Sequence, residues 1–360
     1  MDYNSIRRKT KVVKVGKLHI GYGNPIAVQS MLNTDSHDIE KCILQTKRLI
    51  DAGCDIVRVA VPDMSCVKTV AAIKEEYPDL PLVADIHFDY KLAVEAAAVG
   101  VDKIRINPGN IGEQENIKAV VDACKPRNIP IRIGVNSGSL EKHLLEKFGS
   151  PTPEALAESA LFNASLLEKF DYDDIVISIK SSSATGTFLA NKIVAERCNY
   201  PLHIGVTESG CGDDALIKSS SALGALLLNG IGDTVRISLT DAPEKEVSAA
   251  KKLLISLGFS DEKHIEVVSC PTCGRTQIDL VPIVNELKSR ISELKDIKRS
   301  LKVAAMGCIV NGPGEAKEAD IGFAGGKKCA MLIRHGEIVR KIDESEITNV
   351  LIEEIKKLVY

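Results

Sequence analysis

The sequence predicts an α/β protein in which a (β/α)8 barrel of the TIM type is followed by a smaller α/β domain. Three observations support this fold class. Short apolar runs rich in β-branched residues alternate with helical segments from residue 25 onward. Eight such strand and helix units precede residue 260, after which the order of elements changes. With 360 residues, of which 44% are hydrophobic, the chain is long enough for two domains.

Each predicted barrel strand precedes a segment with helical periodicity, such as Asp38–Ala52, Lys91–Gly100 and Glu244–Leu257. A count of eight favours a closed barrel over an open doubly wound sheet, because the open sheet has no preferred count of eight. No glycine-rich dinucleotide turn follows the first strand either. The strands are expected at Pro25–Met31, Ile56–Val61, Pro81–His87, Lys103–Asn107, Pro130–Asn136, Ile175–Lys180, Leu202–Glu208 and Thr234–Leu239.

Two further segments complete the expected architecture. Lys11–Ile20 is expected to form a hairpin that closes the barrel floor. The domain boundary is tight, with residues 1–260 forming the barrel and 261–360 the second domain. The second domain is expected to contain a helix at Asp279–Leu294, a closing helix, and strands at His264–Ser269, Lys302–Ala305, Met331–Arg334 and Glu337–Ile342.

Composition and charge exclude several function classes. A net charge of −3 gives no global attraction to nucleic acid or to an anionic membrane. The longest apolar stretch, Ala222–Ile231, is shorter than the roughly 20 residues of a membrane span. Met1–Lys17 lacks the apolar core of a signal peptide, so we expect a cytoplasmic protein. Six scattered cysteines are then expected to be reduced and mostly buried, namely Cys42, Cys54, Cys66, Cys124, Cys198 and Cys211.

Cationic side chains interrupt the predicted barrel strands. Arg58, Arg105, Arg132 and Arg236 each lie between β-branched residues. An ion pair with the next helix would account for one such arginine. Because helices cover the outside of a barrel, four arginines and Lys180 are expected to point into its open mouth, where an anionic ligand, best a diphosphate, neutralises them. Alternation places Arg105 with Asn107, Arg132 with Asn136, Ser178 with Lys180, Arg236 with Ser238, and Asp85 with His87 on common faces.

Glu208 is the candidate for proton transfer, because it ends the seventh predicted strand at the carboxyl-terminal mouth. The alternative is a carboxylate that neutralises a neighbouring arginine or caps a loop. Asp85 and His87 end the third strand, where either a functional or a structural role is open.

The second domain carries a cysteine and glutamate constellation. Cys270 and Cys273 form a Cys-x-x-Cys turn, which suits a redox dithiol, a zinc knuckle or an iron–sulfur ligand pair. A second loop, residues 306–315, adds Cys308 and Glu315. Structural zinc usually takes four Cys or His ligands, and only Cys329 and His335 follow Cys308 at moderate distance. Three thiolates and one carboxylate would instead give an iron–sulfur cluster one exchangeable ligand.

These motifs together resemble the 4-hydroxy-3-methylbut-2-enyl diphosphate synthase family, in its short bacterial two-domain form. The resemblance covers essentially the whole chain and rests on residues 132–136, 207–210, 234–238, 270–274 and 306–315. It implies that Cys270, Cys273, Cys308 and Glu315 bind a [4Fe–4S] cluster. It also implies that Glu208 lies beside the reacting carbons, and that the diphosphate is held by Arg58, Arg105, Arg132, Asn136, Lys180, Arg236 and Ser238.

The reaction that the resemblance implies is the two-electron reductive ring opening of 2-C-methyl-D-erythritol 2,4-cyclodiphosphate with loss of water, fed by a flavodoxin or a ferredoxin. A homodimer is also expected. Only twelve positions separate Gly258 from Cys270, at most about 40 Å of extended chain. Since the last barrel helix ends at the floor, each cluster domain is expected to cap the mouth of the partner's barrel.

Two alternatives come from other function classes. A non-enzymatic electron carrier or zinc-stapled scaffold would use the second domain but leave the strand arginines unexplained. A barrel aldolase or phosphosugar isomerase would use Lys180 as a Schiff base, but this gives no role to Cys270, Cys273 and Cys308.

Overall fold

The structure is a computed structural model that describes residues 3–309, 314 and 316–360. It divides into two compact units, Met1–Ser260 and Asp261–Tyr360. The first unit contains an eight-stranded sheet in the order β8-β7-β6-β5-β4-β3-β10-β9, and a parallel bridge between Ile177 and Leu202 joins its two ends. The predicted barrel is therefore confirmed. Its strands are β3 (Ala27–Met31), β4 (Ile56–Ala60), β5 (Leu82–Asp85), β6 (Lys103–Ile106), β7 (Ile131–Asn136), β8 (Ile175–Lys180), β9 (His203–Ile204) and β10 (Thr234–Val235).

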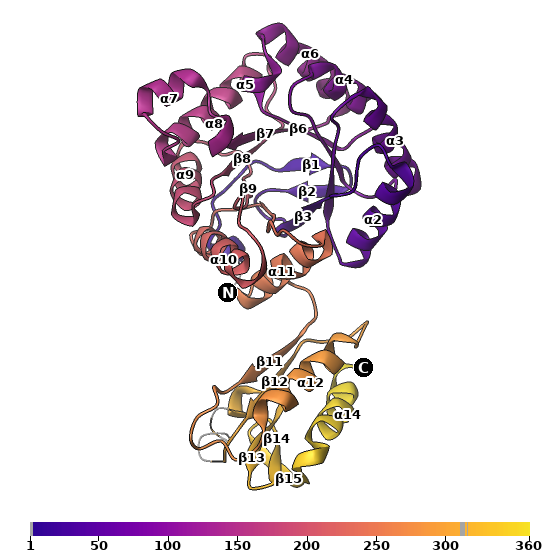
Figure 1. The fold of residues 1–360 in the computed structure, drawn as a ribbon, viewed down its shortest axis with the longest axis vertical. Coiled ribbons are helices and arrows are strands. Elements are labelled where there is room, and N and C mark those ends of the chain that lie inside the picture. Colours follow the sequence, from indigo (N-terminus) through magenta and orange to yellow (C-terminus); the bar gives the residue numbers. More distant parts are fainter. Residues whose placement is uncertain (1–2, 310–313, 315) are drawn as a thin grey trace. The chain divides into compact units, whose positions relative to one another are not determined.

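Helices form the outer ring of the barrel, as Figure 1 shows in a view along its axis. In α2, the N-cap Asp38 accepts a hydrogen bond from the Lys41 N–H, and buried residues recur with helical spacing from Cys42 to Leu49. No helix among the described residues is long and apolar enough to cross a membrane. The main helices are α2 (Ile39–Asp51), α3 (Val67–Glu76), α4 (Tyr90–Ala98), α6 (Gln114–Cys124), α8 (Pro153–Glu168), α9 (Ala184–Arg197), α10 (Gly212–Leu228) and α11 (Pro243–Ser256), and the shorter ones are α1 (Tyr3–Ile6), α5 (Pro108–Ile111) and α7 (Lys142–Phe148).

The predicted hairpin at the floor is confirmed. Strands β1 (Val13–Val15) and β2 (Leu18–Ile20) pair in antiparallel fashion. The apolar side chains of this hairpin pack against residues of the barrel strands, including Ala27 and Ile56. The hairpin thus plugs one end of the barrel, and Figure 1 shows it lying across the ring of helices.

The last two barrel strands are shorter than predicted. Regular pairing in β9 ends at Ile204, although the Arg236 N–H still donates to the Ile204 carbonyl at 3.0 Å. Beyond that point Glu208 and Gly210 adopt positive φ values of 52° and 97°, so the chain turns away from the sheet. Glu208 therefore lies in the loop after β9 and does not end the strand.

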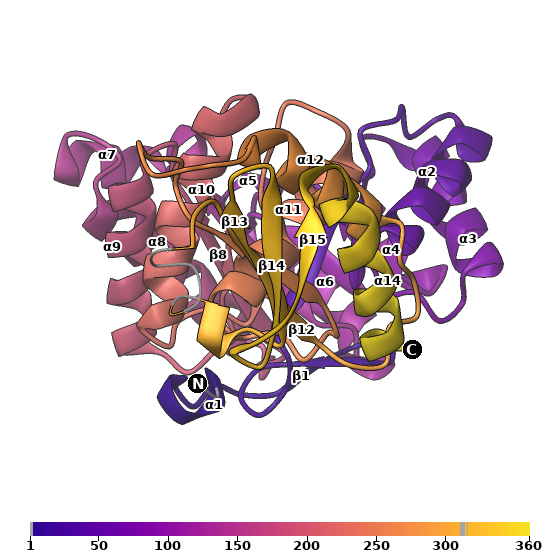
Figure 2. The same cartoon turned by 90° about the horizontal axis from the view of Figure 1, so that it is seen from below.

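The second unit is a five-stranded sheet with two helices on one face. Its strands follow the chain order, and Figure 2 shows the last three side by side. The first three strands are parallel, whereas the last two join by antiparallel pairing. One apolar core unites Leu287, Phe323 and Leu351, so both helices pack on the same side. The elements are β11 (Ile265–Ser269), α12 (Leu280–Ser292), β12 (Leu301–Met306), β13 (Ile321–Gly326), β14 (Cys329–Arg334), β15 (Glu337–Asp343) and α14 (Ile347–Val359).

Strand β13 was not predicted from the sequence, because glycine at positions 322, 325 and 326 normally weakens a strand. Here glycine is required, since a Cβ on Gly322 would collide with the Ala304 carbonyl oxygen of β12. The missing side chains thus allow β13 to pair closely in the middle of the sheet.

None of the ten cysteines, all of which lie among the described residues, forms a disulfide. Cys42, Cys54, Cys66 and Cys124 are buried. The expectation of burial was wrong for Cys211, which is exposed immediately before α10.

Candidate functional site

Cationic side chains from four of the eight strands lie in the barrel interior. Arg58 lies on β4, Arg105 on β6, Arg132 on β7 and Lys180 at the end of β8. All four are buried, and Arg132 is only 1% exposed. Arg105 and Arg132 are direct cross-strand partners, so two like charges stand side by side. Arg236 follows β10 and its side chain is 18% exposed.

Two glycines make room for these long side chains. A Cβ on Gly134 of β7 would collide with the Arg105 Nε. A Cβ on Gly205, after β9, would lie 2.9 Å from the Lys180 Nζ. Because each glycine faces the cation from an adjacent strand, both cations lie across the lumen of the barrel. The site therefore requires glycine at both positions, because a side chain there would collide with a cation.

Asp85 neutralises two of the arginines. Its Oδ2 lies 2.5 Å from Arg58 Nη2, and its Oδ1 lies 3.1 Å from Arg105 Nη1. Burial raises the pKa of the Asp85 carboxyl, but Arg58, the hydrogen bond to His87 and Arg105 together hold it well below its usual value. Asp85 is therefore ionised and has a structural role, since it pairs with two of the buried cations. The strand pattern alone leaves this role undecided.

Glu246 on α11 neutralises Arg236. Its two carboxylate oxygens lie 3.2 Å from the Arg236 Nε and 3.3 Å from Nη2. The same carboxylate accepts hydrogen bonds from the Ser30 hydroxyl at 2.8 Å and from the Leu239 N–H at 3.1 Å. Glu246 was not predicted from the sequence, although an ion pair with the next helix was an alternative for one strand arginine. Arg236 forms this ion pair with the following helix, α11.

The remaining cations have no carboxylate partner among the described residues. Arg132 Nη1 donates to the Gln29 side-chain oxygen at 3.4 Å, and its buried Nε has no partner in the described part of the chain. Burial, followed by repulsion from Arg58, lowers the pKa of Arg132 well below its ordinary value, and burial and Arg236 do the same for Lys180. Guanidinium groups stay protonated in proteins, so these directions express how unfavourable the cations are without an anion. Five cations thus face two paired carboxylates.

Lys103 is a sixth interior cation that the sequence analysis did not assign. It lies two residues before Arg105 on β6, is fully buried, and its Nζ has no hydrogen-bond partner among the described residues. Burial and the neighbouring Arg132 lower its pKa well below the usual value. The period of two that groups Arg105 with Asn107 extends backward to Lys103 and could have identified it.

The polar candidates lie at the carboxyl ends of the strands. Asn136 ends β7 opposite Lys180 in register, and both Asn136 and Ser238 are half-buried. Glu208 is exposed, and its φ of 52° is unusual for a residue with a side chain. Such left-handed backbone at a non-glycine residue is commonly retained where a side chain must point in a particular direction.

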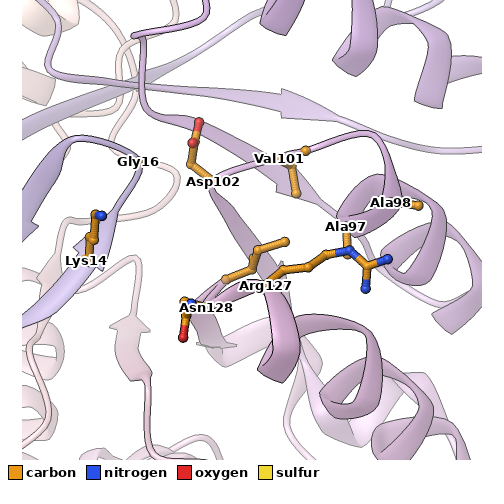
Figure 3. Close-up of a pocket in the computed structure, with 10 residues that line it drawn as sticks. Lys14, Gly16, Ala97, Ala98, Val101, Asp102, Arg127 and Asn128 are labelled. Atoms are coloured by element: carbon orange, nitrogen blue, oxygen red, sulfur yellow. The ribbon is translucent and has the colours of Figure 1, made fainter.

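A pocket at the opposite end of the barrel is a poor candidate for the site. Its volume is about 340 Å³, and Figure 3 shows Gly16 of the floor hairpin and Asp102 and Asn128 of the loops that enter β6 and β7. Asp102 already pairs with Lys74 at 2.7 Å. Because barrel chemistry occurs at the carboxyl ends of the strands, this floor pocket is separate from the cation array.

In the second unit, parallel pairing brings two cysteine loops together. Cys270 comes directly after the last residue of β11, and Cys308 lies two positions after the last residue of β12. Because the two strands are parallel, both cysteines lie at the same edge of the sheet. The Gly307 N–H donates to the Cys270 Sγ at 3.3 Å, and the Gln277 N–H donates to the Gly307 carbonyl at 2.9 Å. Backbone contacts therefore tie the Cys270 loop to the residue that precedes Cys308.

Cys273 lies on the same loop and is exposed. Its N–H donates to the Thr276 hydroxyl at 3.1 Å, and a Cβ on Gly307 would lie 3.1 Å from that same hydroxyl. Hydrogen bonds from the backbone and side chain of Arg275 lower the pKa of the Cys273 thiol, which favours the thiolate that metals bind. Glu315, the fourth expected ligand, lies outside the described residues.

Among the described residues, the cysteines of the second unit do not form a compact ligand group. Four ligands of one zinc ion lie within about 4 Å of one another, since Zn–S bonds are about 2.3 Å. Among the described residues, the only three His, Cys, Asp or Glu ligand atoms within 4.8 Å of one another belong to a different set, His37, Asp63 and Cys66. In the described structure Cys270, Cys273 and Cys308 are thus not gathered as closely as the ligands of one zinc ion.

Comparison with known proteins supports the two-part architecture. One family model, the GcpE TIM-barrel domain, matches residues 10–251, and a second, the GcpE protein C-terminal domain, matches residues 266–357. The chain belongs to the GcpE family. A GcpE relative from Caldicellulosiruptor saccharolyticus is 54% identical over 349 residues, which cover 97% of this chain and 99% of the relative. A second from Caldanaerobacter subterraneus subsp. tengcongensis is 52% identical over 98% of both chains.

Both GcpE relatives are named 4-hydroxy-3-methylbut-2-en-1-yl diphosphate synthase (flavodoxin). A third relative of that name, from Clostridium perfringens, is 51% identical over 98% of this chain and 99% of its own. The resemblance inferred from the motifs is therefore confirmed at the level of the family.

Replacing Asp85 tests the charge balance of the GcpE barrel. In Asp85→Asn, Arg58 and Arg105 lose their carboxylate, so the free energy of unfolding should fall by about 3–5 kcal/mol at pH 7. Since the folded pKa of Asp85 is depressed, its contribution is complete above the unfolded pKa of about 3.9 and is lost as the pH falls through the folded value. The difference between variant and wild type should therefore shrink below about pH 4.

Chemical denaturation at pH 7 and pH 3.5 measures this difference. The matched control is Asp122→Asn, which removes an exposed pair with Lys118 and should change stability by less than about 1 kcal/mol. Equal stabilities for Asp85→Asn and wild type at pH 7 would show that Asp85 does not balance the arginines.

Proposed function

We propose that the chain reductively opens 2-C-methyl-D-erythritol 2,4-cyclodiphosphate to 4-hydroxy-3-methylbut-2-enyl diphosphate, with loss of water, as a step of isoprenoid biosynthesis. The observation that carries this proposal is the surplus of buried cations in the barrel, in a chain whose second unit has cysteine loops that suit an iron–sulfur cluster. The names of the relatives agree with it, since they contain the same product. They give no support to an aldolase or isomerase that uses Lys180 as a Schiff base.

The diphosphate group is the anion that the array lacks. We assign it to Arg58, Arg105, Arg132, Asn136, Lys180, Arg236 and Ser238. Guanidinium forks bind phosphate oxygens in bidentate fashion, and Arg132 still has a buried Nε without a partner in the described part of the chain. Asp85 and Glu246 keep Arg58, Arg105 and Arg236 in fixed positions before the anion arrives. The site is therefore preorganised for a polyvalent anion.

Glu208 is assigned the proton transfer. Its side chain is exposed at the mouth end of the barrel, and its left-handed backbone fixes the direction in which the carboxylate leaves the loop. Removal of a hydroxyl as water needs a proton donor, and Glu208 supplies an exposed carboxyl group at this end of the barrel.

Cys270, Cys273, Cys308 and Glu315 are the residues assigned to a [4Fe–4S] cluster. When bound, such a cluster supplies electrons one at a time and a Lewis-acidic iron. Two electrons per turnover must come from outside the chain, and we propose a flavodoxin or a ferredoxin as the donor. The relatives' names specify flavodoxin. The free thiols are consistent with a reducing compartment, and we place the reaction in the cytoplasm.

We further propose that the working unit is a homodimer in which each cluster domain serves the partner's barrel. The support is the short connection between the end of α11 and Cys270. Barrel helices run antiparallel to the strands, so α11 ends at the floor while the arginines open at the mouth.

Arg132→Met tests the anion site. Loss of a charge-assisted contact should weaken binding of the cyclic diphosphate by about 1.5–3 kcal/mol, roughly 10- to 150-fold in Kd, as measured by isothermal titration calorimetry. Arg127→Met, an exposed arginine that lines the floor pocket, is the control and should bind normally. Wild-type affinity in Arg132→Met would move the phosphate site elsewhere.

Cys308→Ser tests the cluster assignment. Replacing this thiolate should abolish the iron content and the electron paramagnetic resonance signal of the reduced protein. Cys329→Ser is the matched control, because Cys329 begins β14 in the same unit but is not an assigned ligand. Full iron content in Cys308→Ser, or equal loss in both variants, would contradict the assignment.

Mixing two inactive variants tests the dimer. Glu208→Gln has an intact cluster domain and Cys270→Ser an intact barrel, so a mixed dimer contains one site with both parts sound. Activity should therefore return after subunit exchange, to at most about a quarter of the wild-type level for random pairing. A mixture of Glu208→Gln with Arg132→Met is the control, since both defects lie in barrels. Inactivity of proven mixed dimers would overturn the arrangement.

A further inference from the structure

Three side chains with metal-binding atoms converge outside both parts of the proposed site. His37 lies in the loop after β3, whereas Asp63 and Cys66 follow β4. Their ligand atoms all lie within 4.8 Å of one another. His37 and Asp63 have half-exposed side chains, and Cys66 is fully buried beneath them. The group thus has a solvent-facing side and a sulfur at its base.

The imidazole of His37 is held from its far side. Its Nδ1 lies 2.7 Å from the Asp35 Oδ1, and that same oxygen accepts the His37 backbone N–H at 3.0 Å. This contact orients the ring so that Nε2 faces the Asp63 Oδ2 at 2.7 Å. A carboxylate behind the imidazole is the usual outer partner of a metal-binding histidine, because it fixes both the tautomer and the ring orientation.

Asp63 is held in a comparable way. Its Oδ1 accepts hydrogen bonds from the Ser65 N–H at 2.8 Å and from the Ser65 hydroxyl at 2.6 Å. These contacts leave Oδ2 to face His37. The Ser36 carbonyl, next to His37, accepts a hydrogen bond from the Thr69 hydroxyl of α3 at 2.6 Å. The two loops are therefore already fixed relative to each other before any ion binds.

We propose that His37 Nε2, Asp63 Oδ2 and Cys66 Sγ bind a divalent transition metal ion, for which zinc is the best fit. Imidazole nitrogen, carboxylate oxygen and thiolate sulfur are the three donor types that zinc accepts, whereas calcium and magnesium require oxygen. Water completes the tetrahedron on the exposed side. The ion links the loop after β3 to the loop after β4 at the carboxyl-terminal end of the barrel. Strand β4 carries Arg58. This proposal does not depend on the proposed reaction.

The rival explanation is a protonated His37 that bridges Asp35 and Asp63 without any ion. That explanation uses the same two short contacts but gives Cys66 no part. Zinc itself is therefore the probe. Holoprotein with its full iron content is equilibrated with zinc and a competing chelator of known affinity, and zinc per chain is counted by mass spectrometry.

We expect one zinc per chain in the wild type and at least a tenfold weaker association in both His37→Gln and Cys66→Ala. The matched controls are His19→Gln, another exposed histidine, and Cys124→Ala, another fully buried cysteine, and both should keep wild-type binding. His37→Gln changes only a half-exposed side chain, so it tests the site even if Cys66→Ala is unstable.

X-ray absorption at the zinc edge separates this site from zinc taken up by the cysteine loops of the second unit. One sulfur with nitrogen and oxygen neighbours is expected, whereas three sulfurs would mean occupation of Cys270, Cys273 and Cys308 and would overturn the proposal. Absence of bound zinc in the wild type, or equal binding by wild type and His37→Gln, would also overturn it and would favour the protonated bridge.

Discussion

The burial of positive charge inside the barrel is the constraint on which the rest of the first unit depends. A guanidinium removed from water is unfavourable unless it is paired, and Arg58, Arg105 and Arg132 are nearly inaccessible. Asp85 pairs with two of them from β5, in the middle of the group, and Glu246 fixes Arg236 from α11. Glycines 134 and 205 are needed because the cations lie across neighbouring strands. The barrel interior is therefore a charged layer above the apolar plug at the floor.

Backbone pairing plays the corresponding part in the second unit. Parallel strands bring their carboxyl ends to one edge, and β11 and β12 each continue into a cysteine loop at that edge. The Gly307 N–H then donates to the Cys270 sulfur, which stabilises negative charge on it. The topology alone thus brings the Cys270 sulfur to Gly307, 37 positions later in the chain and directly before Cys308.

Sequence patterns predicted most of the fold because apolar strands and amphipathic helices alternate without interruption. The period of two also identified the interior arginines. It did not identify their partners, since Glu246 lies on a helix ten residues after Arg236 and no local pattern distinguishes it from Glu244, two residues earlier on the same helix. The strand pattern alone therefore predicts that a ligand supplies the whole counter-charge, whereas the protein supplies part of it. Strand β13 was not predicted, because its glycines allow close packing against Ala304, which is distant in the sequence.

This division of counter-charge explains how the barrel can fold before an anion binds and still bind one strongly. If every cation were paired internally, no positive potential would remain for a diphosphate. If none were paired, the barrel would carry several uncompensated buried charges. Asp85 and Glu246 pair with Arg58, Arg105 and Arg236. Arg132, the most buried of the four arginines, donates to an amide oxygen at 3.4 Å and has no carboxylate partner among the described residues. The residual positive charge is thus concentrated around Arg132. An anion that binds there stabilises the folded barrel, because it binds to the folded state.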